Sequence, residues 1–412
     1  MVTRLVRVLR ERGLRGLVAA VGRRVFPVRQ VSAPVMPVRD LSRLDGGVDV
    51  LGFFTAEHGV GEAARDLVAT LRSANVPVCT INYTDTESRT DHRFVTDDES
   101  RHRVLVCSIN AEQMVASRDR LPADFYTNRY VIGQWFWELE ESPPWYEPAW
   151  PMVQELWAPT RFIATMLANS APPTVKVAHV PLPVVQTPVD PSLGRADFGL
   201  DDRCMFLFVF DLMSVMKRKN PLGLVEAYTR AFSTGDGTQL VIKSMNGDKR
   251  PDDLATLVAA AAGRPDITII DAYYSRLETS TLISLADCYV SLHRSEGLGL
   301  TLCEAMSHAV PIIATNYSGP TDYLNEDNSC LIPWDRVPVG EGAGGYSPSA
   351  TWAEPRVAEA VEAMRRVHSD PQAARAMAAR GRREILGAFT PGASGTIMRS
   401  RLEEIWSLNS GN

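Results

Sequence analysis

Short apolar runs alternate with helix-like stretches along most of the chain, and this alternation constrains the fold more than any other feature. The first set of runs predicts strands at 47–53, 76–81, 103–109, 129–136, 155–159 and 175–183. A second set predicts strands at 204–210, 239–244, 266–271, 288–293 and 310–315. Strands that alternate with helices form parallel sheets with right-handed crossovers. We therefore expect an α/β protein with two Rossmann-like, doubly wound domains.

A proline-rich segment at 181–202 separates the two sets and is the best candidate for a hinge. We expect an N-terminal domain at 45–185 and a C-terminal domain at 186–385. A basic arm and linker would precede them at 1–44, and a helix at 386–412 would cross back to the N-terminal domain. Such an arrangement places an interdomain cleft at the C-terminal ends of both sheets, where open α/β sheets bind ligands.

Charge is distributed unevenly along the chain. Residues 1–30 hold eight Arg and one Glu, although the whole chain carries a net charge of −6. The acidic total argues against a nucleic-acid partner. A basic amphipathic helix at 1–30 can lie on an anionic membrane surface, and a helix packed on the protein or a solvated arm is the alternative. With no secretory signal or apolar span, we expect a cytoplasmic protein that is peripheral to the inner face of the plasma membrane.

The segment S-E-G-L-G-L-T-L-C-E-A-M-S at 295–307 is the strongest local signal. Glu296 follows a predicted strand, and two glycines precede a predicted helix. Glycines let backbone N–H groups approach a phosphate, and the helix N-terminus adds unpaired donors. Glu304 can accept hydrogen bonds from sugar or ribose hydroxyls. Alternatively, Thr301 and Glu304 form a capping box that only stabilises the helix.

A cationic cluster lies in F-D-L-M-S-V-M-K-R-K-N-P at 210–221, where we expect a strand to end and a helix to start near Lys219. Lys217 and Lys219 are two of only five lysines, and Arg218 lies between them. Positive charge at a strand end facing a cleft suits a phosphate leaving group. The alternative is a solvated helix terminus, although cations at a helix N-terminus oppose its dipole.

Three further regions contribute candidates. Gly59 and Gly61 form a loop before a helix that can bring backbone donors near a diphosphate, or that is simply a left-handed turn. His58 in that loop is a candidate for acceptor contact or a structural residue. Lys243 ends a strand and either approaches the nucleotide or lies on the surface.

Four of the eight tryptophans lie within 132–150, in the stretch I-G-Q-W-F-W-E-L-E-E-S-P-P-W-Y-E-P-A-W. Aromatic faces stack on sugar rings and carboxylates bind hydroxyls, so Trp137 and Glu138 are candidates for lining an acceptor or sugar pocket. A core aromatic cluster is the alternative.

Together, the Glu-x7-Glu spacing of 295–307, the stretch A-V-P-I-I-A-T-N-Y-S-G-P-T-D-Y-L at 309–324 and N-S-C-L-I-P at 328–333 resemble the GT4-type family of retaining glycosyltransferases. The resemblance covers residues 48–408 and implies a GT-B architecture. It implies transfer of a sugar from a nucleoside-diphosphate sugar to a glycan, lipid or other hydroxyl acceptor. The basic arm and the aromatic stretch suggest that this acceptor belongs to cell-envelope glycan or glycolipid synthesis.

The resemblance also assigns site residues. Glu296 would contact the transferred sugar, Glu304 would hold the ribose, and the backbone of Gly299, Leu300 and Thr301 would meet the diphosphate, beside Gly297 and Leu298. The family clamps the diphosphate with an Arg and, five residues later, a Lys. Lys219 matches that Lys, whereas Ser214 stands at the position of the family Arg. The missing positive charge would then come from Arg218, or the Ser214 hydroxyl would donate a neutral hydrogen bond in its place.

Two departures keep a second function open. The family's His after the fourth strand is replaced here by Trp135-Phe136-Trp137-Glu138, and Ser214 replaces the family arginine. A catalytically inactive GT-B protein that binds nucleotide sugars or glycans is therefore the alternative. An NAD-dependent oxidoreductase lacks its G-x-G-x-x-G motif, and a GT-B epimerase is a minor alternative. No D-x-D motif occurs, and the resemblance implies neither an essential metal ion nor a cofactor, with Glu296 and Lys219 as the catalytic pair.

Overall fold

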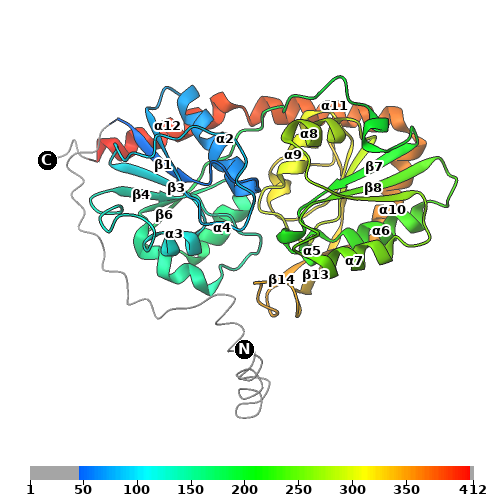
Figure 1. The fold of residues 1–412 in the computed structure, drawn as a ribbon, viewed down its shortest axis with the longest axis horizontal. Helices are drawn as coiled ribbons and strands as arrows, with labels where there is room; N and C mark the ends of the chain where they lie inside the picture. Colours follow the sequence, from blue (N-terminus) through cyan, green and yellow to red (C-terminus); the bar gives the residue numbers. More distant parts are fainter. Residues whose placement is uncertain (1–45, 409–412) are drawn as a thin grey trace, which may run out of the picture.

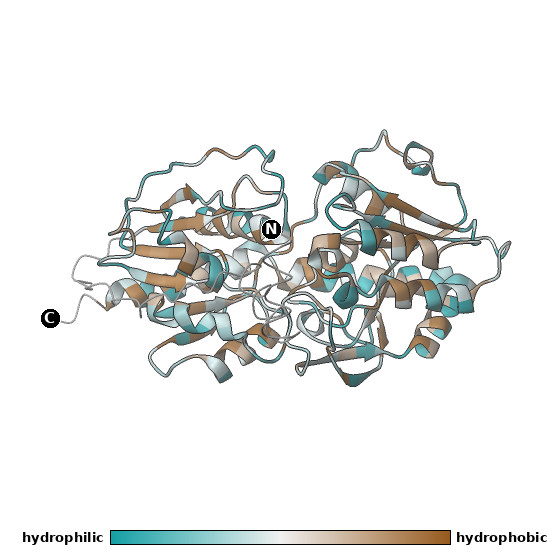
Figure 2. Ribbon diagram, turned by 60° about the horizontal axis from the view of Figure 1, so that its bottom comes forward, coloured by the Kyte–Doolittle hydropathy of each residue, from teal (hydrophilic) through white to brown (hydrophobic). Residues whose placement is uncertain are grey.

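A computed structural model describes residues 46–408, which form two α/β domains and a C-terminal helix (Figure 1). The basic arm at 1–30 lies outside the described residues. Both sheets are six-stranded and parallel, which confirms the predicted fold class. Figure 2 shows hydrophobic residues concentrated in the strands of both sheets. No helix among residues 46–408 is long and apolar enough to cross a membrane.

The first domain has the strand order β2-β1-β3-β4-β5-β6. Its central strands β1 and β3 are buried along their whole length, as expected of strands covered on both faces by helices. The strands are β1 (Val48–Gly52), β2 (Val78–Asn82), β3 (Val104–Ser108), β4 (Tyr130–Gly133), β5 (Glu155–Ala158) and β6 (Lys176–His179). The helices are α2 (Gly59–Ser73), α3 (Ala111–Ser117), α4 (Arg161–Ser170) and the 3₁₀ segment η1 (Pro144–Met152).

The second domain has the order β12-β11-β10-β7-β8-β9, which is the order of a Rossmann sheet. Its strands are β7 (Cys204–Val209), β8 (Thr238–Ser244), β9 (Ile267–Asp271), β10 (Cys288–Ser291), β11 (Ile312–Thr315) and β12 (Cys330–Ile332). Its helices are α5 (Met216–Lys219), α6 (Pro221–Ala231), α7 (Pro251–Ala260), α8 (Arg276–Ser284), α9 (Leu300–Ser307), α10 (Val357–Ser369) and α11 (Pro371–Ala388). Three short 3₁₀ segments are η2 (Arg195–Phe198), η3 (Leu212–Ser214) and η4 (Gly319–Asp322).

The last helix, α12 (Pro391–Ser407), returns to the first domain while α11 lies along the second (Figure 1). Met398, Leu402 and Ile405 pack into the core formed by β1, β3 and α2. Arg401 makes a bidentate ion pair with the buried Glu155 at the start of β5, with an Nε–Oε1 distance of 2.6 Å. The chain therefore crosses between the domains twice, once after β6 and once before α12.

An antiparallel hairpin, β13 (Trp334–Pro338) and β14 (Thr351–Pro355), stands outside both sheets. Pro355 ends β14, and helix α10 begins only at Val357. The hairpin projects from the second domain beside α5, on the side that faces the first domain (Figure 1).

Candidate functional site

Two loops of the second domain meet at the point where its strand order reverses. Strand β7 pairs with β10 there, and crevices at such a point are where open α/β sheets bind ligands. The segment after β7 leads to α5, which carries Lys219, and the segment after β10 carries Glu296. Sheet topology therefore brings together two residues that lie 77 positions apart in the sequence.

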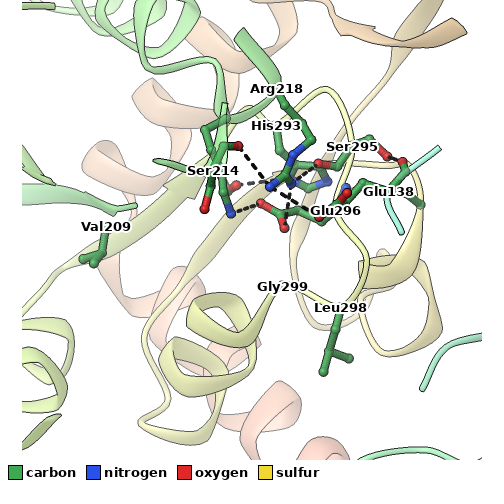
Figure 3. A network of polar contacts seen from close by, with 12 residues as sticks. Glu138, Val209, Ser214, Arg218, His293, Ser295, Glu296, Leu298 and Gly299 are labelled. Carbon is green, nitrogen blue, oxygen red and sulfur yellow. Dashed lines mark hydrogen bonds and ion pairs between the residues drawn. The ribbon is translucent and has the colours of Figure 1, made fainter. Parts of the chain in front are cut away.

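Glu296 forms the centre of a buried charge cluster (Figure 3). Its carboxylate is paired with Lys219 Nζ through Oε1 and lies 3.2 Å from Arg218 Nη1 through Oε2. Arg218 Nη2 lies 3.6 Å from Oε1 of Glu138, which belongs to the first domain. Two cations and two carboxylates thus meet across the interdomain boundary.

The cluster keeps Glu296 ionised. Burial alone would raise the pKa of the Glu296 carboxyl, but the neighbouring Lys219 and Arg218 outweigh burial and lower it to about 2. Burial lowers the pKa of Lys219, and the attraction of Glu296 opposes that fall. The charge at Glu296 is therefore fixed at neutral pH, and it can hold hydroxyl groups or cations but cannot serve as a proton donor.

The cationic segment differs from the prediction in its local structure. Lys217, Arg218 and Lys219 form the last turn of the short α5, and Asn220, with φ 56°, separates it from α6. Cations are favourable at a helix C-terminus, so the helix dipole does not oppose them. Arg218 is 4% exposed, and therefore the alternative of a solvated terminus is wrong for it. Ser214 contributes its carbonyl oxygen, which accepts a hydrogen bond from Arg218 Nη2 at 3.1 Å.

The glycine segment 297–299 leads into α9 without a side-chain cap. Gly299 is the N-cap residue with φ 81°, so Thr301 and Glu304 do not form a capping box, and that alternative is wrong. Leu298 packs against the cores of both domains. The carbonyl of Gly297 accepts a hydrogen bond from Thr160 Oγ1 of the first domain at 3.0 Å. The segment is therefore held from both sides of the boundary.

Glu304 lies in α9 and has one unsatisfied carboxylate oxygen. Its Oε1 is buried without a hydrogen-bond partner among the described residues. Burial raises the pKa of the Glu304 carboxyl, and Arg276 opposes this rise. A buried carboxylate oxygen without a donor is unusual in a folded protein, and a water molecule, an ion or a ligand hydroxyl can supply the donor.

The loop at 58–61 approaches α9 from the first domain. A Cβ atom at Gly59 would lie 3.5 Å from Leu300 Cδ1, and one at Gly61 would lie 2.7 Å from the carbonyl oxygens of Phe53 and Ala56. Neither glycine has a positive φ, so the reading of a left-handed turn is wrong. Close approach of backbone oxygens explains Gly61, whereas a Cβ at Gly59 would make only an ordinary van der Waals contact. His58 is the N-cap of α2, where its Nδ1 accepts from Gly61 N at 3.1 Å.

Lys243 is not a surface residue, since it is 3% exposed at the end of β8. Its Nζ lies 5.1 Å from the centroid of the Tyr274 ring. Burial lowers its pKa to about 8, and Asp271 and Asp211 oppose that fall.

The tryptophans divide between core and site. Trp135 and Trp150 are buried in the first domain, which agrees with the alternative of a core aromatic cluster. Trp137 is half-buried, and its ring centroid lies 5.1 Å from that of Tyr346 in the hairpin. Tyr346 donates its hydroxyl to Glu138 Oε2 at 2.8 Å. Sequence reasoning missed Tyr346, and only the run of glycines around it signals a shaped loop.

Ser318 was also missed, although it lies in the quoted stretch 309–324. Its φ of 66° and ψ of −151° fall in a region that is essentially reserved for glycine. Its Oγ accepts the backbone N–H of Glu296 at 2.8 Å. Ser318 also lines an interdomain cavity of about 580 Å³. The remaining lining residues are Glu140, Arg161, Phe162, Thr165, Met166, Asn169, Asn316, Tyr317, Thr321 and Asp322.

One group of potential metal ligands occurs within residues 46–408, formed by Asp49, Cys79 and His102. The Asp49 carboxylate already accepts the backbone N–H groups of Arg101 and His102 and pairs with the buried Arg129. It lies near the N-terminal end of β1, away from the loops that carry Glu296. We therefore assign this group to the structure of the first domain.

Comparisons with known proteins show which family and fold the chain resembles. Residues 206–384 match the family model of glycosyl transferases group 1. The chain is 26% identical to a trehalose synthase of Rubrobacter xylanophilus over 74% of this chain and 73% of that protein. It is 29% identical to an alpha-D-kanosaminyltransferase of Streptomyces kanamyceticus over 35% of this chain and 36% of that one.

Solved structures share the fold at low sequence identity. The sucrose-phosphate synthase of Thermosynechococcus elongatus is 14% identical to this chain and matches its fold with a TM-score of 0.65. The match covers 88% of this chain and 100% of the synthase chain. Anabaena HepE, solved with UDP and glucose, is 12% identical to this chain and matches its fold with a TM-score of 0.60. The match covers 87% of this chain and 100% of the HepE chain. The chain is therefore a glycosyltransferase with the GT-B fold, and its residues 206–384 match the glycosyl transferases group 1 family.

Proposed function

We propose that this protein transfers a sugar, with retention of anomeric configuration, from a nucleoside-diphosphate sugar to a hydroxyl of a glycan or lipid-linked acceptor in the synthesis of cell-envelope glycans or glycolipids. The observation that carries the proposal is the buried cluster of Glu296, Lys219 and Arg218 beside a glycine segment that opens a helix. A diphosphate needs fixed cations and backbone donors, and a sugar needs a fixed acceptor of hydroxyl hydrogen bonds. The cluster supplies both within one crevice.

On the donor side, Lys219 and Arg218 would neutralise the diphosphate, and the backbone N–H groups of Gly299, Leu300 and Thr301 would bind its oxygens. In the structure Lys219 is paired with Glu296. When the phosphates engage Lys219, the Glu296 carboxylate is released to accept hydrogen bonds from the transferred sugar. The unsatisfied oxygen of Glu304 would accept a ribose hydroxyl, while Lys243 would face the nucleotide.

During transfer, the bond between the anomeric carbon and the β-phosphate oxygen breaks, and a bond to the acceptor oxygen forms on the same face of the sugar. The acceptor hydroxyl gives its proton to the departing phosphate oxygen. Negative charge develops on that phosphate, and one preorganised donor contributes about 3–4 kcal/mol to such a step. Lys219 and Arg218 would stabilise that charge.

Trp137 and Glu138 would form the acceptor side, together with the interdomain cavity beside Ser318. The cavity combines aromatic rings of Phe162 and Tyr317 with amide groups of Asn169 and Asn316, a mixture suited to sugars. The names of the similar proteins support sugar substrates, because they include a trehalose synthase and a structure that contains UDP and glucose. His58 is less suited to acceptor contact, because its Nδ1 caps α2.

The donor is tested by thermal denaturation of the full chain with UDP, GDP and ADP, followed by the corresponding glucose or mannose nucleotides. A ligand that binds only the folded protein raises the Tm, by linkage. Transfer is then followed by release of the nucleotide, and the product's anomeric configuration is read from its proton coupling constant. An inverted product would contradict retention.

Glu296→Ala separates an enzyme from an inactive binder. We expect the variant to bind the free nucleotide while transfer falls sharply. A wild type that binds a nucleotide but consumes no nucleotide sugar would favour the binder. Transfer should also persist in EDTA, because protein cations face the phosphates in our proposal. Loss of activity in EDTA that Mn²⁺ restores would refute that part.

A further inference from the structure

The hairpin β13–β14 and its connecting loop, residues 339–350, contact both domains at the site. Lys217 Nζ of α5 donates to the carbonyl of Glu341 at 2.5 Å. From the first domain, Trp145 packs against the loop, 3.6 Å from where a Cβ of Gly345 would lie. Leu139 joins a small apolar cluster with Val339, Ala343, Ala350 and Trp352. The loop is thus a distinct element that spans the interdomain boundary.

The loop and the residue beneath it adopt backbone conformations with positive φ. Gly340, Gly342 and Gly344 all have positive φ values of 72°, 73° and 64°. Val215, which lies under Gly344, has a φ of 62°, and a β-branched residue in this region is strained. Strain of this kind persists where surrounding structure imposes it, and it clusters at functional sites.

A continuous chain of polar contacts leads from the proposed donor side to this loop. Lys219 contacts Glu296, Glu296 contacts Arg218, and Arg218 contacts Glu138. Tyr346 then holds the far oxygen of Glu138, at 2.8 Å. The Glu138 side chain is 23% exposed, compared with 10% for Glu296. Glu138 is therefore the accessible carboxylate of the chain, and Tyr346 fixes its orientation.

The hairpin also borders the interdomain cavity. Arg336 of β13 makes a bidentate contact with Glu140, and Trp334 Nε1 donates to the carbonyl of Asn316 at 2.7 Å. Glu140 and Asn316 both line that cavity. One side of the hairpin therefore flanks the cavity, while its loop reaches Glu138 and Trp137.

We propose that residues 339–350 form an acceptor-side flap in which Tyr346 is a positioning and specificity residue, holding Glu138 toward an acceptor hydroxyl and forming with Trp137 the aromatic wall for an acceptor sugar. The proposal rests on the proposed function. If the second domain binds the nucleotide, the attached sugar lies at Glu296. An acceptor must then approach from the side of the first domain, where Glu138 and the flap lie. The flap would also exclude water, which otherwise hydrolyses the donor.

The test compares Tyr346→Phe, Tyr346→Ala and the control Ser347→Ala in the full chain. Ser347 lies in the same loop, and its hydroxyl forms a hydrogen bond with that of the exposed Ser349. The donor is whichever of UDP-glucose, GDP-glucose and ADP-glucose raises the wild-type Tm most, and the acceptor probe is glucose. Donor hydrolysis without acceptor and transfer with acceptor are measured for each variant.

We expect Tyr346→Phe to raise the acceptor KM about 10- to 100-fold, the loss that accompanies one hydrogen bond to a charged group. Its donor affinity and its hydrolysis rate should stay near the wild type, because the ring still closes the flap. Tyr346→Ala should raise the acceptor KM further and increase the ratio of hydrolysis to transfer. Ser347→Ala should match the wild type in all three quantities.

Two results would overturn the inference while leaving the enzyme assignment intact. One is an unchanged acceptor KM and hydrolysis ratio in Tyr346→Ala with wild-type stability. The other is an equal loss of donor affinity and transfer in both tyrosine variants, which would place Tyr346 on the donor side or in the fold alone. Failure of the wild type to consume any nucleotide sugar would instead defeat the proposed function itself.

Discussion

Replacing Glu296 by Gln should destabilise the folded protein, because the substitution removes the carboxylate that neutralises Lys219 and Arg218. The lowering of the Glu296 pKa from 4.5 to about 2 corresponds to about 3 kcal/mol of stabilisation of the carboxylate in the folded state. Gln resembles the protonated acid in size and keeps an acceptor oxygen but lacks the charge. We therefore expect the free energy of unfolding to fall by about 3 kcal/mol at neutral pH, within the range for breaking a buried pair.

The assay is urea denaturation of wild type and Glu296→Gln at a series of pH values. A folded-state pKa below the unfolded value contributes stability that is complete above pH 4.5 and is lost as the pH falls through about 2. The difference between the two proteins should therefore be constant from neutral pH to about pH 5 and should shrink below it. Glu140→Gln is the matched control, since its interdomain pair with Arg336 is 43% and 48% exposed and should contribute at most about 1 kcal/mol.

The reasoning would be refuted if Glu296→Gln lowered the free energy of unfolding by less than about 1 kcal/mol, as the control does. Glu296 would then behave as an exposed ion pair and not as a buried one. A difference between the two proteins that persists unchanged as the pH falls below 4 would also refute it, because the stabilisation would then not come from the ionised carboxylate. Binding of free nucleotide adds an independent check. Gln at 296 leaves Lys219 without its partner, so the affinity for the free nucleotide should stay the same or rise.

Three further predictions concern Lys219, His58 and the basic arm at 1–30. Lys219→Met should lower kcat for transfer about 10²- to 10³-fold, as loss of one preorganised donor does. The control Lys176→Met, at the exposed end of β6, should leave kcat unchanged. Equal kcat values for the wild type and Lys219→Met would remove Lys219 from the mechanism. Burial and then Arg65 lower the pKa of His58 to about 4, so the wild type should lose stability relative to His58→Asn as the pH falls from 6.5 to about 4; parallel stability curves would contradict a buried neutral cap. Deletion of residues 1–30 should release the protein from vesicles that contain anionic lipid in a sedimentation assay, and unchanged binding would reject the membrane-surface proposal.

Much of the fold was predictable from the sequence because the relevant signals are local. Each buried parallel strand is a short apolar run, and the glycines of 297–299 mark the start of a helix without any knowledge of its neighbours. The arrangement of Lys219 and Glu296 at one crevice also follows from local signals, since the ends of adjacent parallel strands meet at one edge of a sheet. Local reasoning failed where a pattern had two readings: the Thr301–Glu304 spacing fits a capping box, yet Gly299 is the cap.

The sequence by itself determined the two sheets, the crossing points and the pairing of a cationic strand end with a glycine-opened helix. Only the tertiary structure decided that Arg218 is buried against Glu296 and Glu138, that Lys243 is enclosed, and that a hairpin carries Tyr346 across the domain boundary. These features depend on contacts between residues that are tens to hundreds of positions apart, such as Glu138 and Tyr346. No periodicity encodes such contacts, because burial and charge pairing are set by which surfaces meet after the chain has folded.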